Sequence, residues 1–377
     1  MSLVVDEHRE YLSDTHRIGA FSSAIRSLVK PGQVVLDLAS GTGILGLLAC
    51  QAGAVRVYAI ESGDIAGLAR RLADENGYGD RITIINEHST RVQLPEPVDV
   101  IVGDLAGRFG FEAGLFEILS DARRRFLKPG GVFMPSTVEM WVAPVEAAEV
   151  RPQVDFWSNP VAGLTFGAAH AIARSTGYPR RFDPEDLLAR GLPITSARLA
   201  DDTRTLSGSA RFIISRRAIM HGLAGWFSAT LAPDVALTNA PGAANRINRR
   251  NVFFPLRDSA AVEAGDHVSV TMVIRPETLI VRWRVQIHRG EMLLHTTDTS
   301  TFEGMLLSRE ELARSRPDFR PTLNEAGLAR RTVVDLCDGV RSNREIEGEV
   351  FARHPQLFQS LDEATAFVAE VVTRYAR

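Results

Sequence analysis

The chain has 377 residues, of which 45% are hydrophobic and 24% are charged. These proportions are those of soluble globular proteins, and they exclude a disordered, collagen-like or coiled-coil chain. The length suits two or three domains. Forty-three basic and 46 acidic side chains give a net charge of −3, which excludes a general electrostatic attraction to nucleic acid or to anionic lipid.

The cysteines and the N-terminal segment indicate the cellular environment. Cys50 and Cys337 are far apart and form no CxxC pair, so we expect two reduced thiols and no metal site. The segment MSLVVDEHREYL carries acidic residues where a signal peptide needs a basic and then an apolar region, and no apolar stretch of about 18 residues occurs. We therefore expect a cytoplasmic protein that binds neither membrane nor nucleic acid.

Residues 1–137 are expected to form an α/β domain. The β-branched runs VVLDL, VRVYAI, ITIIN, VDVIVGD and GGVFMP alternate with helical patterns at ILGLLACQAG, 69–76 and 115–126. This alternation predicts a parallel sheet with crossover helices. Ahead of it, Ile18, Phe21, Ile25 and Leu28 share one helical face, which predicts a helix that ends before Pro31.

Two further domains are expected. The runs TVEMWVAPVE, ARFIISRRA, GWFSATLA, HVSVTMVI and LIVRWRVQIH predict an antiparallel β domain over residues 138–315, with an arm near 165–200. From Leu323 the apolar spacing is helical, and Ser360 followed by Glu363 matches a capping box. Residues 316–377 are therefore expected to form a small helical domain.

The most informative segment is residues 34–61, VVLDLASGTGILGLLACQAGAVRVYAIE. A strand reaches Asp37, a turn of small residues with Gly41 and Gly43 follows, and a second strand ends at Glu61. The glycines allow the backbone to approach a ligand, and an acid at this place can accept both hydroxyl groups of a ribose. The segment predicts a nucleoside site at the carboxyl ends of the strands.

Three interpretations of this turn are open. Gly41, Gly43 and Gly46 match the G-x-G-x-x-G pattern of nicotinamide cofactor sites. A purely structural turn is a second possibility. Asp37 favours the third, S-adenosylmethionine, because in dinucleotide sites the strand runs almost directly into the first glycine, whereas here an acid precedes Gly41 by four residues.

These motifs resemble protein arginine methyltransferases. The glycine segment is similar to that family's first two cofactor motifs, YLSDTHRIGAF to its amino-terminal helix, VDVIVGDLAGRFGFEAGLFEIL to its substrate loop and helix, and NVFFPLRDSAAVEAGDHVSVTMVI to its second domain. The resemblance covers about residues 8–300. It implies a Rossmann-like class I methyltransferase domain followed by an antiparallel β-barrel, S-adenosyl-L-methionine as the cofactor, and a homodimer that forms through the arm.

The resemblance also implies residue roles. Arg17, next to Asp14, is expected to meet the carboxylate of the methyl donor. The other residues that we assign to the donor site are Asp37, Gly41, Gly43, Ile44, Leu45, Glu61, Ser62, Ser89 and Thr90. His8 is a candidate base or a residue of a lid over the cofactor, and a structural role is its alternative.

The substrate loop departs from the family pattern. The family has two glutamates nine residues apart, and the matching positions here are Asp104 and Ala113, with Glu112 one residue early. A guanidinium has a pKa above about 12, so methyl attack requires carboxylates that hold it and draw its charge away from the attacking nitrogen. Either Asp104 and Glu112 both face the acceptor, or Glu112 is a solvated acid near a helix start. The family's Thr-His-Trp turn is replaced by Arg246, Ile247 and Asn248.

The C-terminal segment resembles PqqD-like peptide-recognition elements of ribosomal peptide natural-product pathways. The shared features are a leucine-asparagine entry, a helix that ends in LCDG, and a Ser-x-x-Glu-Ile helix start. Such modules capture a leader peptide by adding a strand beside their helices. A helical cap over the barrel or over a dimer seam is the alternative.

The sequence as a whole predicts an S-adenosylmethionine-dependent N-methyltransferase. The expected acceptor is a guanidino nitrogen of a peptide or small molecule in a biosynthetic pathway. The alternatives are O-methylation of a peptide side chain, a catalytically inactive peptide-binding scaffold with the same fold, and a nicotinamide-dependent oxidoreductase.

Overall fold

The computed structural model describes residues 4–201, 203, 205–305 and 319–376. Contacts within the chain divide it into two units, residues 1–305 and residues 306–377. The predicted boundary between residues 315 and 316 lies outside the described residues. In the described part of the chain, no helix is both long enough and apolar enough to cross a membrane.

The first unit begins with the predicted parallel sheet. Its strand order is β3-β2-β1-β4-β5, and all four pairings are parallel. All five residues of β1 are buried, as is typical of a parallel strand that is covered on both faces. The strands are β1 (Val34–Leu38), β2 (Arg56–Ile60), β3 (Ile82–Ile85), β4 (Val98–Gly103) and β5 (Leu127–Met134).

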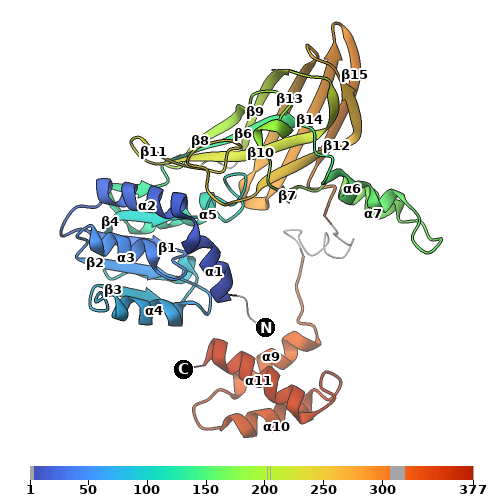
Figure 1. Ribbon diagram of the computed structural model, residues 1–377. Coiled ribbons are helices and arrows are strands. Elements are labelled where there is room, and N and C mark those ends of the chain that lie inside the picture. Colours follow the sequence, from blue (N-terminus) through green and yellow to red (C-terminus); the bar gives the residue numbers. More distant parts are fainter. Residues whose placement is uncertain (1–3, 202, 204, 306–318, 377) are drawn as a thin grey trace. The chain divides into compact units, whose positions relative to one another are not determined.

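Helices pack around this sheet (Figure 1). The expected amino-terminal helix is α2, which buries Phe21 and Ile25 and is capped by Asp14 through a 3.1 Å hydrogen bond from the Arg17 N–H. The elements are α1 (Val4–Ser13), α2 (Thr15–Leu28), α3 (Ile44–Gln51), α4 (Ala66–Glu75), the 3₁₀ turn η1 (Ser89–Arg91) and α5 (Leu115–Phe126). The predicted α/β order is therefore confirmed.

The second part of this unit is antiparallel, as expected. One sheet has the order β7-β12-β10-β6-β8 with β11 on β10, and the other has the order β15-β14-β13-β9. Its strands are β6 (Thr137–Val145), β7 (Tyr178–Arg180), β8 (Leu192–Arg198), β9 (Leu206–Ile213), β10 (Ala218–Ala232), β11 (Val235–Thr238), β12 (Asn251–Val262), β13 (His267–Arg275), β14 (Ile280–Arg289) and β15 (Met292–Ser300). The pairing gives two sheets, so closure into a barrel stays a prediction.

Aromatic packing fixes the loop after β4 against this β domain. The Phe109 ring meets Phe254 of β12 edge-on at 5.1 Å, and Phe254 lies 5.3 Å from Trp283 of β14, which is fully buried. The Trp283 indole N–H donates to the Pro255 carbonyl at 3.0 Å. Because such rings bury large areas, this stack holds the predicted substrate loop in place.

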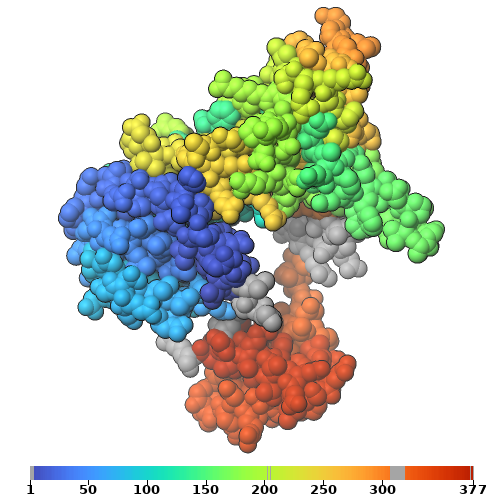
Figure 2. All heavy atoms as spheres, viewed as in Figure 1, coloured from blue at the N-terminus to red at the C-terminus, as the bar shows by residue number. Residues whose placement is uncertain are grey.

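A short helical segment projects from the β domain between β6 and β7. It comprises α6 (Arg151–Asp155), the 3₁₀ turn η2 (Phe156–Ser158) and α7 (Gly167–Ala173), and it stands out from the surface in Figures 1 and 2 (green). The expected arm at 165–200 overlaps it only at α7, because later residues form β7, the 3₁₀ turn η3 (Pro184–Asp186) and β8, which return to the sheet.

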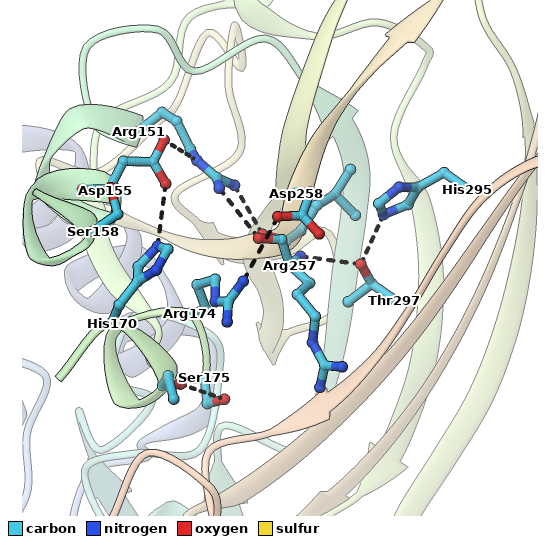
Figure 3. Close-up of polar contacts among 12 residues, drawn as sticks. Arg151, Asp155, Ser158, His170, Arg174, Ser175, Arg257, Asp258, His295 and Thr297 are labelled. Carbon is cyan, nitrogen blue, oxygen red and sulfur yellow. Dashed lines mark hydrogen bonds and ion pairs between the residues drawn. The ribbon is translucent and has the colours of Figure 1, made fainter. Parts of the chain in front are cut away.

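Arg151 anchors the base of this projection (Figure 3). Its guanidinium donates to the Leu256 carbonyl at 2.8 Å, to the Arg257 carbonyl at 3.2 Å and to the Asp155 carboxylate at 2.7 Å. On the other side, Ser175 and Thr299 share a 2.8 Å hydrogen bond between their hydroxyl groups. These buried contacts tie α6 and α7 to β12 and β15.

The second unit contains the predicted C-terminal helices, α9 (Glu325–Leu336), α10 (Asn343–Arg353) and α11 (Leu361–Tyr375), around a small apolar core. The predicted capping box at Ser360 is only half formed, because the Ser360 hydroxyl accepts from the Glu363 N–H at 3.3 Å while the Glu363 carboxylate accepts from Gln359. The reciprocal box occurs at Ser342 and Glu345, where α10 starts.

Candidate active site

The glycine turn joins β1 to α3 and approaches Glu61. Gly41 and Gly43 have φ angles of +55° and +80°, in the left-handed region that favours glycine. The Glu61 carboxylate accepts hydrogen bonds from the Gly41 N–H at 2.9 Å and from the Gly63 N–H at 2.7 Å. The acid that follows β2 therefore lies against the turn that follows β1, as the sequence predicts for adjacent parallel strands.

Asp37 takes a different place from the one expected. Its carboxylate accepts from the Gly46 N–H at 2.8 Å, its other oxygen lacks a partner among the described residues, and the side chain is fully buried. Burial raises the pKa of Asp37 to about 7, against the lowering effect of the Gly46 bond. Asp37 thus positions α3 behind the glycine turn and does not line the cavity described next.

One cavity of about 570 Å³ opens where α1, α2, the glycine turn, the loop after β4 and the loop before β12 meet. Of the predicted donor residues, it is lined by Arg17, Gly41, Ile44 and Leu45, whereas Gly43 and Glu61 are not among its lining residues. Ser62 is exposed, Ser89 is buried in η1, and Thr90 bonds to His88, so these three do not line it. They lie after β2 and β3, at the carboxyl end of the same sheet.

His8 covers the glycine turn from α1. A Cβ atom at position 41 would lie 2.6 Å from His8 Cε1, so this ring would have to shift if residue 41 had a side chain. The His8 ring also meets Tyr11 edge-on at 6.0 Å. This placement is that of a covering residue, one of the three roles that the sequence left open.

Asp104 follows β4 and is the central charge of the cavity wall. Its carboxylate accepts from the Arg17 guanidinium and from both terminal nitrogens of Arg249, each at 3.2 Å. Burial alone would raise the pKa of Asp104, but the charges of Arg249 and Arg17 outweigh it and lower the pKa to about 2. Asp104 is therefore ionised and shared between two arginines.

Arg17 links the two halves of the cavity. Besides Asp104, its guanidinium donates to the Tyr11 carbonyl at 3.1 Å and lies 4.8 Å above the Tyr11 ring. The side chain is 11% exposed. The residue predicted to meet the donor's carboxylate is thus also bonded to the acid predicted to face the acceptor.

Glu112 lines the cavity, but its oxygen atoms are used by its own loop. The carboxylate accepts from the backbone N–H groups of Arg108, Phe109 and Phe111 at 2.9–3.2 Å. It is seated against Gly107, whose φ is +68° and where a Cβ would lie 2.5 Å from the carboxylate. Burial raises the pKa of Glu112 against these donors. Glu112 is therefore neither part of an inward-facing clamp nor a solvated acid, the two alternatives that the sequence left open.

The loop before β12 supplies functional candidates that the sequence analysis missed. The Asn248 N–H donates to Asp14 at 2.6 Å, which ties the cap of α2 to this loop, and Arg249 reaches Asp104. Arg249 directly follows the three residues, Arg246 to Asn248, that replace the Thr-His-Trp turn. The basic pair Arg249 and Arg250 directly before a strand was the available signal.

The site fits the predicted donor in three respects. The cavity volume lies within the range of small-molecule sites. Glu61 stands at the glycine turn, where a ribose would be held. The Ser40 hydroxyl lines the cavity and is buried with no hydrogen-bond partner among the described residues, so it is available to a polar ligand.

Comparisons with known proteins agree with this geometry. The family model of ribosomal protein L11 methyltransferase (PrmA) matches residues 16–138. Protein arginine N-methyltransferase 6 of Xenopus laevis is 31% identical over 249 residues, which are 62% of this chain and 73% of that protein. Its counterpart in Danio rerio is 32% identical over 242 residues, 60% of this chain and 69% of that protein.

A solved structure shows a similar fold. The PRMT1 enzyme-prozyme heterotetrameric complex of Trypanosoma brucei with AdoHcy aligns with a TM-score of 0.70 at 22% identity. The alignment covers 78% of this chain and 97% of that chain. The similarity therefore includes the parallel sheet and the antiparallel domain that follows it.

Proposed function

The chain belongs to the protein arginine N-methyltransferase family, and from this premise we propose that it methylates a guanidino nitrogen of a peptide or small molecule in a biosynthetic pathway. It is an S-adenosylmethionine-dependent methyltransferase.

In this proposal the donor lies along the glycine turn. Glu61 accepts the ribose hydroxyl groups, Gly41 allows close backbone approach, and Arg17 pairs with the carboxylate. The bound donor supplies a methyl group on a sulfonium, whose sulfur leaves as a neutral thioether when the methyl is transferred. His8 and the rest of α1 exclude water from above the turn, so that alignment of the acceptor contributes much of the rate.

The observation that most supports a guanidino acceptor is the environment of Asp104. Its side chain is a buried, ionised carboxylate at the carboxyl end of β4, and it already pairs with guanidinium groups of the chain itself. A carboxylate of this kind orients a planar guanidinium through two parallel hydrogen bonds. It also favours accumulation of positive charge on the nitrogens that do not attack.

The test is transfer of a labelled methyl group to guanidino compounds. We expect the full chain to transfer the label. Asp104→Asn should lower kcat/KM at least about a hundredfold, because one charged contact is lost in the transition state. Asp298→Asn is the matched control, because this carboxylate of β15 also pairs with two arginines, Arg282 and Arg284, and does not line the cavity. Equal loss in both variants would remove Asp104 from the reaction.

One observation favours a second function. Ala113 stands where the family has its second glutamate, and the Glu112 oxygen atoms are bonded within the loop, so of the two acids in this loop only Asp104 is left to hold an acceptor. This arrangement also suits O-methylation of a peptide carboxylate or hydroxyl. Mild base releases a methyl ester but neither a methyl ether nor an N-methyl group. Base treatment of the labelled product therefore identifies carboxylate methylation, and fragmentation in a mass spectrometer distinguishes a methylated hydroxyl from a methylated guanidino nitrogen. A labelled donor that binds but transfers to nothing would instead support the inactive scaffold.

We further propose that the C-terminal unit binds a leader peptide. Two apolar residues of this unit are exposed: Val334 of α9, which is 47% exposed, and Val340 after it, which is 87% exposed. A leader packed beside the helices would cover such residues. Val334→Asp is expected to weaken binding of a leader-bearing precursor to the full chain, measured by fluorescence anisotropy. Binding that is equal with and without the leader would contradict this role.

A homodimer through the projecting segment is the remaining proposal. Apolar side chains are exposed along it, which is typical of an interaction surface; they are Phe156, Trp157, Val161, Leu164 and Phe166. Trp157→Glu is expected to convert a dimer to a monomer in sedimentation velocity. A variant that sediments like the parent chain would argue against this interface.

A further inference from the structure

The Arg249 guanidinium is bonded to the Asp104 carboxylate, the group that we assign to the guanidinium of the acceptor. Its two terminal nitrogens face the two Asp104 oxygen atoms at 3.2 Å each, and one also donates to the Gly107 carbonyl at 3.2 Å. The Arg249 side chain is 16% exposed. With Arg17, three donor contacts already use the roughly four lone-pair directions of this carboxylate.

Charge balance limits how an acceptor can enter. Asp104 carries one negative charge, and Arg17 and Arg249 carry two positive charges beside it. Even with Arg17 paired to the donor's carboxylate, an entering guanidinium would find Asp104 already neutralised by Arg249, in a partly buried site where charges are poorly screened. An acceptor that displaced Arg249 would leave that guanidinium without its partner in a place with little solvent, which is unfavourable.

From this arrangement we infer that the preferred acceptor carries an anionic group close to its guanidinium. Such an acceptor exchanges partners with the internal ion pair: Asp104 takes its guanidinium and Arg249 takes its carboxylate. Both buried charges stay paired, and no net charge is left behind. Arg249 is then the residue that determines acceptor specificity, and this inference rests on the proposed function.

The rest of the cavity wall favours an anion as well. Arg108 and Arg250 line it, both are exposed, and neither guanidinium has a hydrogen bond or ion pair among the described residues. Asp14 is engaged by backbone N–H groups, Glu112 by its own loop and Asp104 by two arginines, which leaves Glu10 as one acid against the two arginines Arg108 and Arg250. The available charge around the acceptor is therefore positive.

A matched pair of ligands tests the inference. N-acetylarginine and N-acetylarginine amide differ only in one carboxylate, and the peptides acetyl-Gly-Arg-Asp-Gly-amide and acetyl-Gly-Arg-Asn-Gly-amide differ likewise in a side chain. Each is titrated calorimetrically into the full chain loaded with S-adenosylhomocysteine. We expect the acidic member of at least one pair to bind at least about tenfold more tightly, the effect of one charge-assisted contact. The pair that shows the preference distinguishes a small guanidino acid from a peptide.

Variants locate the effect. Arg249→Gln is expected to reduce the preference to within about twofold, whereas Arg71→Gln, an exposed arginine of α4, leaves it unchanged. Donor binding by Arg249→Gln checks that the site is folded. Equal affinities within both pairs, no binding of any of the four ligands, or a preference that survives in Arg249→Gln would overturn the inference.

Methyl transfer is measured separately on the same ligands. Transfer to both members of each pair at equal kcat/KM would overturn the inference and leave the proposed function standing. Preferential binding of an acidic member without transfer to any guanidino nitrogen would contradict the proposed function and leave Arg249 as the residue that selects an anionic ligand.

Discussion

The ion triad at the cavity makes a quantitative prediction about stability. Asp104→Asn keeps the shape of the side chain but leaves Arg17 and Arg249 without their counter-charge. Arg249→Gln removes one guanidinium and leaves Asp104 paired with Arg17. A double-mutant cycle over Asp104 and Arg249 therefore isolates their pairing.

The magnitude follows from burial and from the pKa. Removal of one partner from a fully buried pair costs about 3–5 kcal/mol, and the 6% and 16% exposure of Asp104 and Arg249 reduces this to about 2–4 kcal/mol for Asp104→Asn. The lowering of the Asp104 pKa from 3.8 to about 2 is worth about 2 kcal/mol of stability, which agrees. We expect Arg249→Gln to lower the free energy of unfolding by about 1–2 kcal/mol. The double variant should lower it by at least about 1 kcal/mol less than the sum of the two single variants.

The pH dependence has a definite sign. Because the folded-state pKa of Asp104 is lowered, its contribution is present above about pH 4 and is lost as the pH falls toward about 2. The difference between the parent chain and Asp104→Asn should shrink over that interval.

Urea unfolding measures these free energies. All four tryptophans, Trp141, Trp157, Trp226 and Trp283, lie in the unit formed by residues 1–305, so their fluorescence reports that unit alone in the full chain. Costs that add to within about 0.5 kcal/mol in the double variant would refute the pairing.

Three other predictions concern the glycine turn. Glu61→Ala should weaken donor binding by roughly 1–3 kcal/mol in calorimetry, because a charged acceptor is lost, and unaltered affinity would remove Glu61 from the site. Gly41→Ala should weaken donor binding by about tenfold or more, since the new Cβ would lie 2.6 Å from His8 and φ is +55°; parent-like affinity would refute this. The raised pKa of Asp37 means that stability falls as the pH rises from about 4 to about 7. Asp37→Asn should remove that fall, on the order of 2–4 kcal/mol in urea unfolding, and parallel pH profiles would contradict it.

Local patterns predicted the elements that periodicity determines. The continuous apolar runs became buried parallel strands, and the helix expected at 115–126 is α5, Leu115–Phe126. Glu61 was found beside Gly41 because the carboxyl ends of adjacent parallel strands meet at one sheet edge.

Features that depend on distant or conformational contacts were not predictable. The direction of the Glu112 carboxylate depends on a left-handed backbone at Gly107, which composition does not reveal. The pairing of Asp104 with Arg249 joins residues 145 positions apart, beyond the reach of any periodic pattern. Asp37 has the expected position at the strand, but its carboxylate accepts from the Gly46 N–H of α3, a contact that a strand pattern does not indicate.

The most direct test is to locate the transferred methyl group. The full chain is incubated with isotopically labelled S-adenosylmethionine and N-acetylarginine, and the product is fragmented in a mass spectrometer. We expect the label on a guanidino nitrogen, in a bond that resists mild base. A label on the carboxylate as a base-labile ester, or donor bound with no label transferred, would contradict it.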